Sequence, residues 1–351
     1  MYNLMNVINM KKFFVYFLVL AVVIVSACTQ NQPGNVETKP ERIVLAYVFG
    51  DRTIPDISHV THINYAFGHV NETFDGVRIN SEEHLRRIVA LKEQKPSLKV
   101  LLSIGGWGSG GFSEMASVGA LRQAFAADCK RVIDEFGLDG IDLDWEYPTH
   151  SWHPAVASSP EDYGNYTLLC IDIRKAIGWD VLFTIATLAD ADPIIDYETL
   201  ANYKDFFNIM TYDLAMLRED SPPGHQGALY RSDKVLRISC EEAVDKHIAA
   251  GIPPEKLNLG VLFGGRGRRV PDLDPIALTV GEGYTIQWDD VAKASYVTNA
   301  EGEFVRSFEC ARAIEAKMEF VKERGLLGTM YWSYNALAPV FSQIMYDRLI
   351  E

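Results

Sequence analysis

The sequence is poor in three features that would each point to a particular class of protein: cysteine, positive charge and long apolar runs. Its five cysteines include no Cys-x-x-Cys or Cys-x-x-His pair, which argues against a metal site. The 33 Lys and Arg against 47 Asp and Glu give a net charge of -14, which argues against a nucleic-acid partner bound through a basic face. The apolar run at residues 13–25 has only thirteen residues, too few to span a bilayer.

The amino terminus has the pattern of an export signal. Lys11 and Lys12 precede the apolar run, which ends in the sequence Val-Ser-Ala-Cys at Cys28. Small residues before a cysteine resemble the lipobox of bacterial lipoproteins, so we predict a signal peptide at 1–27 and lipidation of Cys28. The alternative is a plain secretory signal with an incidental cysteine. Met10-Lys11-Lys12 already opens a complete signal, so Met10 can be the true start. We expect an exported protein, lipid-anchored to a bacterial membrane at the outer membrane, the cell surface or the periplasmic face.

Residues 28–41 are polar and rich in Gln, Asn and Pro, which predicts a flexible tether. The four remaining cysteines fall in helix-like segments and allow three complete pairings, among which the sequence does not choose. We predict buried free thiols at these positions, which are Cys129, Cys170, Cys240 and Cys310.

From residue 42 to the end, strand-like apolar runs alternate with helical periodicity, which predicts an α/β fold with a parallel sheet. The predicted strands are residues 43–49, 59–67, 98–104, 141–146, 181–186, 206–212, 257–263 and 328–333. Helical patterns lie between them, at residues 81–94, 121–136, 163–177, 240–250 and 310–324. Eight strand–helix units are what a closed (β/α)8 TIM barrel needs, with its active site at the carboxyl ends of the strands.

The most informative stretch is DGIDLDWEYP at residues 139–148. Asp142, Asp144 and Glu146 alternate with apolar residues, so their carboxyl groups lie on one face of a strand, roughly 6.6 Å apart along it. A solvated acidic edge strand is the alternative, but the apolar residues between the acids indicate that the other face is packed. Carboxyl groups this close should titrate as a coupled set that shares a proton. Asp139 has the opposite parity and suits a structural role.

This acidic stretch, with Tyr147-Pro148 after it, resembles the DxxDxDxE signature of glycoside hydrolase family 18, the chitinases. The resemblance covers the chain from about residue 42 and implies one catalytic barrel at 42–351. Between the seventh strand and its helix it implies a small insertion of α+β type at about 265–307.

Further strand ends match the same family. The runs SIGGW at 103–107, MTYD at 210–213 and MYWS at 330–333 resemble family motifs. The resemblance implies a sugar-binding surface formed by Trp332, Trp107, Tyr147, Tyr47, Ser103, Gly105, Gly106, Met210 and Arg266. Two departures reduce its stacking surface, because Arg218 and Gly264 stand where the family often has aromatic rings.

The resemblance also implies roles in catalysis assisted by the substrate's own acetamide group, with retention and without metal or cofactor. Glu146 would be the general acid and base, and Asp144 would hold the acetamide nitrogen. Asp142 would share a proton with Asp144, Tyr212 would donate to the acetamide oxygen, and Asp213 would position the distorted sugar.

We therefore predict a monomeric chitinase that cleaves β-1,4 bonds in oligo- or polysaccharides of N-acetylglucosamine. An endo-β-N-acetylglucosaminidase acting on N-glycans is one alternative. A non-catalytic glycan-binding lipoprotein is another, and the presence of Glu146 argues against it.

Overall fold

The computed structural model describes residues 42–50, 53–154, 156–215 and 222–351. The predicted signal peptide, Cys28 and tether lie outside these residues, and so does Arg218.

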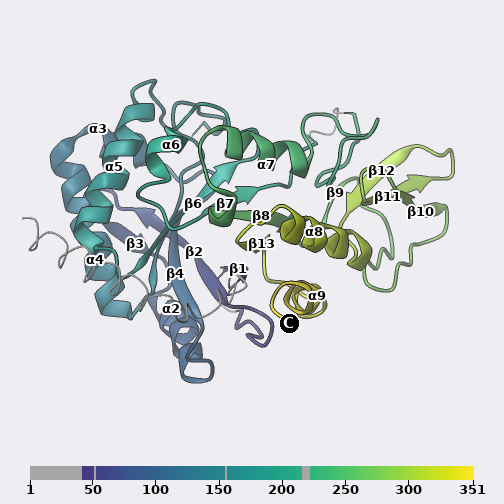
Figure 1. The fold of residues 1–351 in the computed structure, drawn as a ribbon, viewed down its shortest axis with the longest axis horizontal. Coiled ribbons are helices and arrows are strands. Elements are labelled where there is room, and N and C mark those ends of the chain that lie inside the picture. Colours follow the sequence, from purple (N-terminus) through teal and green to yellow (C-terminus); the bar gives the residue numbers. More distant parts are fainter. Residues whose placement is uncertain (1–41, 51–52, 155, 216–221) are drawn as a thin grey trace, which may run out of the picture. The chain divides into compact units, whose positions relative to one another are not determined.

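Within the described residues, eight parallel strands form a closed barrel (Figure 1). In sheet order they are β1 (Ile43–Phe49), β13 (Gly328–Trp332), β8 (Leu257–Leu262), β7 (Phe207–Met210), β6 (Leu182–Leu188), β5 (Gly140–Asp144), β4 (Lys99–Gly105) and β2 (His62–Val70). Strand β1 pairs with both β13 and β2, which closes the barrel. The predicted (β/α)8 fold is confirmed.

Helices surround this barrel (Figure 1). They are α2 (Glu82–Val89), α3 (Phe112–Ser117), α4 (Gly119–Phe136), α5 (Asp162–Ile177), α6 (Tyr197–Leu200), α7 (Cys240–Ala249), α8 (Ala311–Glu323) and α9 (Ala338–Leu349), with 3-10 turns at Ala90–Glu93 and Pro254–Lys256. Outward-facing strand residues such as Ile141, Leu143 and Phe183 are fully buried against them. The same packing buries Cys129, Cys170 and Cys240, while Cys310 is buried against the core of the insertion; all four are free thiols, as predicted.

Strands β5 and β7 end earlier than predicted, inside the acidic stretch and the MTYD run. Strand β5 stops at Asp144, and β7 stops at Met210, so Glu146, Tyr212 and Asp213 lie on the loops at the carboxyl edge. Strand β2 instead runs three residues beyond its predicted end, because it continues into an antiparallel pair with β3 (Val77–Ile79).

The insertion between β8 and α8 is a four-stranded antiparallel sheet. Its strands, in sheet order, are β10 (Tyr284–Asp289), β11 (Ala294–Asn299), β12 (Phe304–Phe308) and β9 (Gly265–Gly267). Val297, Val305 and Phe308 form its small core. Between residues 265 and 308 the structure has no helix, so the expected α+β type is wrong. Sequences such as YTIQWD and FVRSF have the two-residue period of strands, which leaves no apolar stripe for a helix.

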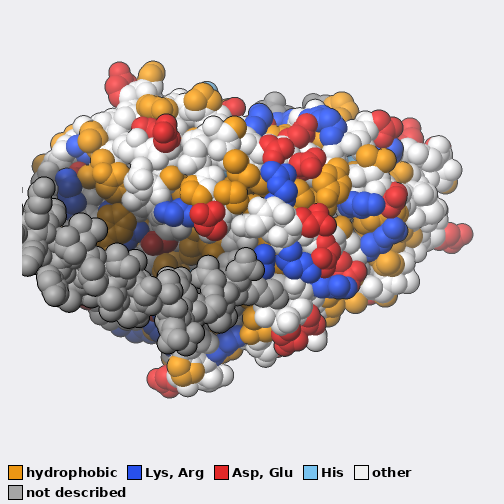
Figure 2. Space-filling view, viewed as in Figure 1, with side chains coloured by type: hydrophobic (Ala, Val, Ile, Leu, Met, Phe, Trp, Pro, Cys, Tyr) orange, Lys and Arg blue, Asp and Glu red, His pale blue; other side chains and the backbone are white. Residues whose placement is uncertain are grey.

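On the face seen in Figure 2, basic and acidic side chains are interspersed. None of the helices in the described part of the chain has the length and apolar character needed to cross a membrane.

Candidate active site

Asp142 lies at the centre of a polar layer inside the barrel. Its side chain is fully buried and accepts hydrogen bonds from the Tyr47 hydroxyl at 2.9 Å and the Ser103 hydroxyl at 2.7 Å. It also accepts from the Thr184 hydroxyl at 2.5 Å and from Asn208 Nδ2 at 3.3 Å. Burial raises the pKa of Asp142, and the hydroxyl donors partly oppose that rise because they stabilise the charged form.

Sheet register brings these partners together. Ser103, Asp142 and Thr184 are lateral neighbours on β4, β5 and β6. Asn208, on β7, is linked in turn to Asn258 on β8 at 3.0 Å. Sequence reasoning missed Thr184, Asn208 and Asn258. The available signal was a single polar residue inside an otherwise apolar strand, as in FNIM and LNLGVL.

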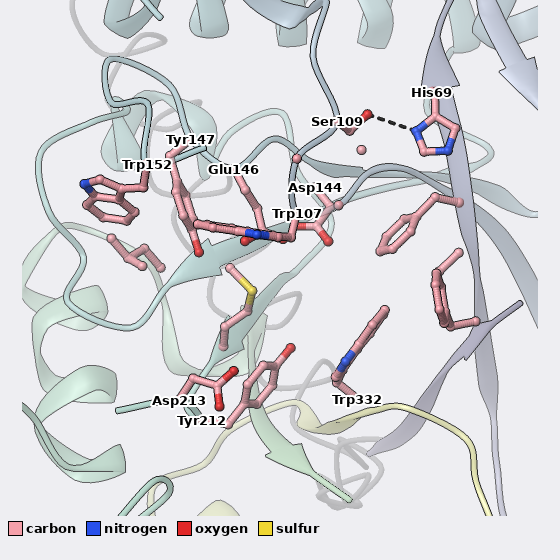
Figure 3. Close-up of a pocket in the computed structure, with 18 of the residues that line it drawn as sticks. His69, Trp107, Ser109, Asp144, Glu146, Tyr147, Trp152, Tyr212, Asp213 and Trp332 are labelled. Carbon is pink, nitrogen blue, oxygen red and sulfur yellow. Dashed lines mark hydrogen bonds between the residues drawn. The ribbon is translucent and has the colours of Figure 1, made fainter. Parts of the chain in front are cut away.

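Asp144 and Glu146 lie above this layer and face the cleft (Figure 3). Burial raises the pKa of Asp144 well above its usual range, and the charges of Glu146 and Asp142 add to that rise. Burial also raises the pKa of Glu146 to about 7, an effect that the neighbouring Tyr147 reduces and the charge of Asp213 increases. Glu146 therefore holds a proton near neutral pH, as a general acid must.

Asp144 Oδ1 is buried without a partner among the described residues. The sharing of a proton between Asp142 and Asp144 stays a prediction. The unpaired oxygen points to a missing donor, and an acetamide N–H of a bound sugar has the required chemistry.

The cleft above the acids has a volume of about 1190 Å³. The predicted residues that line it are Gly105, Gly106, Trp107, Asp144, Glu146, Tyr147, Met210, Tyr212, Asp213, Arg266 and Trp332. Tyr47 and Ser103, grouped above with the sugar-binding residues, lie one layer lower and donate to Asp142, which is where the resemblance also places their hydroxyls. Their hydroxyls reach inward because both strands point these positions into the barrel.

Two glycines allow the strand β4 loop to pass close to its neighbours. A Cβ atom at Gly105 would lie 2.0 Å from the Asp144 carbonyl oxygen, and one at Gly106 would lie 2.6 Å from the Phe67 ring. Both residues have positive φ, at 128° and 89°, which other residues rarely adopt. A side chain at Gly105 would displace the backbone at Asp144, and one at Gly106 would displace the Phe67 ring.

Aromatic rings form the floor and one wall of the cleft. The Trp332 ring stacks on Phe67, with 5.6 Å between centroids and 22° between planes, and Phe49 lies at a further 5.6 Å from Trp332. Trp107 and Trp152 lie on the side of the cleft that carries Glu146 and Tyr147, and both are more than half exposed (Figure 3). Sequence reasoning did not place Phe49, Phe67 or Trp152 at the site, because a lone aromatic residue is more often core.

The insertion contributes Arg266, which forms a two-pronged ion pair with Asp213. Arg266 Nε lies 2.7 Å from Asp213 Oδ1, and Arg266 Nη2 lies 3.0 Å from Oδ2. Asp213 has a positive φ of 56°, so its backbone needs support. That support includes a hydrogen bond from its amide to Gln226 Oε1 at 3.4 Å.

Gln226 is in turn held by a buried ion pair. Gln226 Nε2 donates to Glu309 Oε1 at 3.3 Å, and Lys317 Nζ donates to the same oxygen at 2.5 Å. Neither Glu309 nor Lys317 is more than a few per cent exposed. These contacts connect α8 to the loop that carries Tyr212 and Asp213, and nothing in the local sequence indicated them.

The described residues contain no group of three or more His, Cys, Asp or Glu side chains that could hold a metal ion. Asp139 lies away from the cleft, where it accepts from the Val100 amide at 2.9 Å and pairs with Lys92 at 2.8 Å. This position fits the structural role that its strand parity predicts.

A family model described as "Glycosyl hydrolases family 18" matches residues 34–336. The chain belongs to glycosyl hydrolase family 18. Chitinase A1 of Niallia circulans is 30% identical in an alignment 293 positions long that covers 71% of this chain and 42% of that protein. Chitinase 1 of Aphanocladium album is 27% identical in an alignment 307 positions long that covers 79% of this chain and 70% of that protein.

Solved structures agree with this family 18 assignment. A family 18 N-acetylglucosaminidase from Paenibacillus barengoltzii superposes with a TM-score of 0.76 at 33% identity, over 88% of this chain and 100% of that one. The cell-surface chitinase ChiW from Paenibacillus sp. superposes with a TM-score of 0.75 at 28% identity, over 88% of this chain and 43% of that one. This chain therefore spans less than half the length of chitinase A1 and of ChiW.

Proposed function

We propose that this family 18 protein is a retaining chitinase that hydrolyses β-1,4 bonds between N-acetylglucosamine units. The observation that carries the proposal is Glu146, a cleft carboxyl whose pKa of about 7 keeps it protonated near neutral pH. It lies beside Asp144 and across the cleft from Trp332 (Figure 3), where it would protonate a glycosidic oxygen. The similarity to several chitinases and to an N-acetylglucosaminidase supports the substrate class.

In the proposed reaction the acetamide carbonyl oxygen of the bound sugar attacks C1. Glu146 donates its proton to the glycosidic oxygen as the bond from C1 to that oxygen breaks, and an oxazolinium ion forms. Glu146 then accepts a proton from water, which adds to C1 and re-forms the acetamide with net retention. No carboxylate nucleophile is required.

The surrounding residues stabilise the charges that develop in this sequence. Asp144 accepts from the acetamide N–H and offsets positive charge on the ring. Tyr212 donates to the acetamide oxygen, and burial with the nearby acids raises the pKa of its hydroxyl well above the usual range, so it stays a donor. The Trp332 ring supports the reacting sugar from below.

Product analysis tests the proposal. N-acetylglucosamine tetramers and pentamers should be cleaved with retention, and Glu146→Gln should lower turnover by about 10² to 10⁴ while oligomer binding persists. A thiazoline analogue of the oxazolinium ion should inhibit competitively. Preferential cleavage of an N-glycoprotein would favour the endo-β-N-acetylglucosaminidase alternative, and binding without cleavage would favour a non-catalytic glycan-binding protein.

We also propose that the protein is exported and lipid-anchored through Cys28, on the basis of the Val-Ser-Ala-Cys run after a charged and apolar leader. Cys28→Ser should move the protein from the membrane fraction to the soluble one or leave an uncleaved precursor. Unchanged membrane association of a cleaved, unlipidated protein would contradict the anchor.

A further inference from the structure

Four arginines gather where the insertion meets the barrel, in a protein whose net charge is -14. They are Arg266, Arg268, Arg269 and Arg306, on and beside strands β9 and β12. Arg266 is paired with Asp213 in the cleft. No Asp or Glu among the described residues lies within 4.0 Å of the charged nitrogens of the other three, and that sets them apart from most cations on this surface.

Arg306 is held in a fixed orientation that leaves its charge without a counterion. Its guanidinium donates to the carbonyl oxygens of Gly265 at 3.0 Å, Arg268 at 3.2 Å and Gly267 at 3.4 Å. Burial and the neighbouring charge of Arg266 lower the pKa of Arg306, so an anion placed beside it would relieve both effects. Carbonyl oxygens orient a guanidinium but do not neutralise it.

Arg306 and Arg269 line a second hollow of about 300 Å³. Its remaining wall is apolar, with Val270, Phe308 and Leu337, and no Asp or Glu borders it. An apolar hollow with a few convergent charged donors is the usual form of a site for a small ligand group. Its size suits a sulfate or carboxylate with part of a sugar ring.

The hollow and the catalytic cleft border the same short segment, residues 264–266. Gly264 and Gly265 border the hollow, and Arg266, the next residue, borders the cleft. The side chains of Arg266 and Arg306 lie on opposite faces of the β9–β12 pair, so a bound glycan would reach the hollow around β9, the edge strand of this sheet. A Cβ atom at Gly264 would meet no other atom within 4 Å, so the space there is open. At this position we expected an aromatic ring, and the chain has instead a glycine that borders the same hollow as Arg269 and Arg306.

We propose that this hollow is an anion subsite that receives a carboxylate or sulfate group carried by the glycan bound in the cleft. The subsite rests on the proposed glycosidase function and adds to it a substrate class, namely N-acetylglucosamine glycans with acidic substituents. Arg269 and Arg306 bind the anion, and the apolar wall packs against the sugar that carries it. A neutral oligomer leaves the two arginines without a counterion.

Equilibrium binding in a Glu146→Gln background tests the subsite without consuming the ligand. The ligands are a neutral N-acetylglucosamine tetramer, its 6-sulfated form, and a tetramer in which alternate sugars carry a lactyl carboxylate. At least one anionic tetramer should bind more tightly than the neutral one, and the two anionic ligands distinguish sulfate from carboxylate. Arg269→Gln should weaken that anionic ligand by about fivefold, as for a partly exposed ion pair, and leave the neutral one unchanged.

Arg306→Gln should weaken anionic binding by about tenfold or more, because Arg306 is less exposed, and Arg306→Lys should restore part of it. Arg87→Gln, on the exposed surface of α2, makes the same change in net charge far from the hollow in sequence and should alter nothing. Equal affinity for neutral and anionic tetramers would overturn the subsite, and so would equal effects of Arg87→Gln and Arg269→Gln. The arginine variants are also tested for binding to vesicles that contain anionic lipid. If they lose vesicle binding while their oligomer binding is unchanged, the subsite is overturned and the arginines form a surface contact instead.

Hydrolysis of the neutral tetramer by the unmodified protein tests the proposed function separately. Cleavage without any preference for anionic ligands would refute the subsite alone. Absence of cleavage, together with arginine-dependent anionic binding, would refute the glycosidase function and leave the anion site in place.

Discussion

Glu146→Gln should make the folded protein more stable at alkaline pH even as it removes activity. The carboxyl group of Glu146 has a pKa of about 7 in the folded protein, against an ordinary value of 4.5. Below pH 4.5 the group is protonated in both the folded and unfolded states and contributes no difference. Above pH 7 it is ionised in both states, and the folded state bears the penalty of a buried charge beside other acids.

The size of this penalty follows from the two pKa values. The interval between 4.5 and about 7 corresponds to about 3 kcal/mol in the free energy of unfolding. Because Glu146 opens partly onto the cleft, solvent screening makes this the upper value. Removing its charge also lowers the pKa of Asp144, which acts in the same direction.

Urea unfolding at several pH values between 4.5 and 8.5 measures the effect. The gain in unfolding free energy of Glu146→Gln over the unmodified protein should grow with pH and level off above pH 7. Glu301→Gln, on an exposed turn of the insertion, is the control for loss of one carboxylate. A gain that is the same at every pH, or equal to that of the control, would refute the argument.

Three further predictions follow from the same structure. Asp142→Asn should change the shape of the pH–rate profile between pH 4 and 9, because Asp142 helps raise the pKa of Asp144; a profile that keeps its shape at reduced height would contradict coupled titration. Lys317→Met leaves Glu309 buried without its cation and should lower the free energy of unfolding by about 3–5 kcal/mol; Lys317→Met combined with Glu309→Gln should recover much of this loss, and failure to recover it would show that packing dominates. Soluble oligomers should be hydrolysed faster than crystalline chitin at equal enzyme concentration. Stripping a chain from a crystal needs a long row of stacking rings, and the exposed tryptophans that line the described cleft are Trp107 and Trp152. Comparable rates would mean that another stacking surface exists.

The sequence determined the family and the position of the acids. Asp142, Asp144 and Glu146 alternate along one short strand, and alternation needs only neighbouring residues to place carboxyl groups on one face. The eight strand periods determined the barrel for the same reason, because each period is a local property of a few residues.

The tertiary structure decided which groups surround those acids. The Asp142 partners Thr184 and Asn208 lie 42 and 66 residues away, and only the register of β5, β6 and β7 brings them within hydrogen-bond distance. Asp213 is paired with Arg266 from an insertion 53 residues further along the chain. Two features depend on burial and on distant charges. One is the pKa of about 7 at Glu146, and the other is the position of Arg269 and Arg306, without a counterion, beside Gly264. Neither can be read from a local pattern, because both are properties of surroundings that distant segments build.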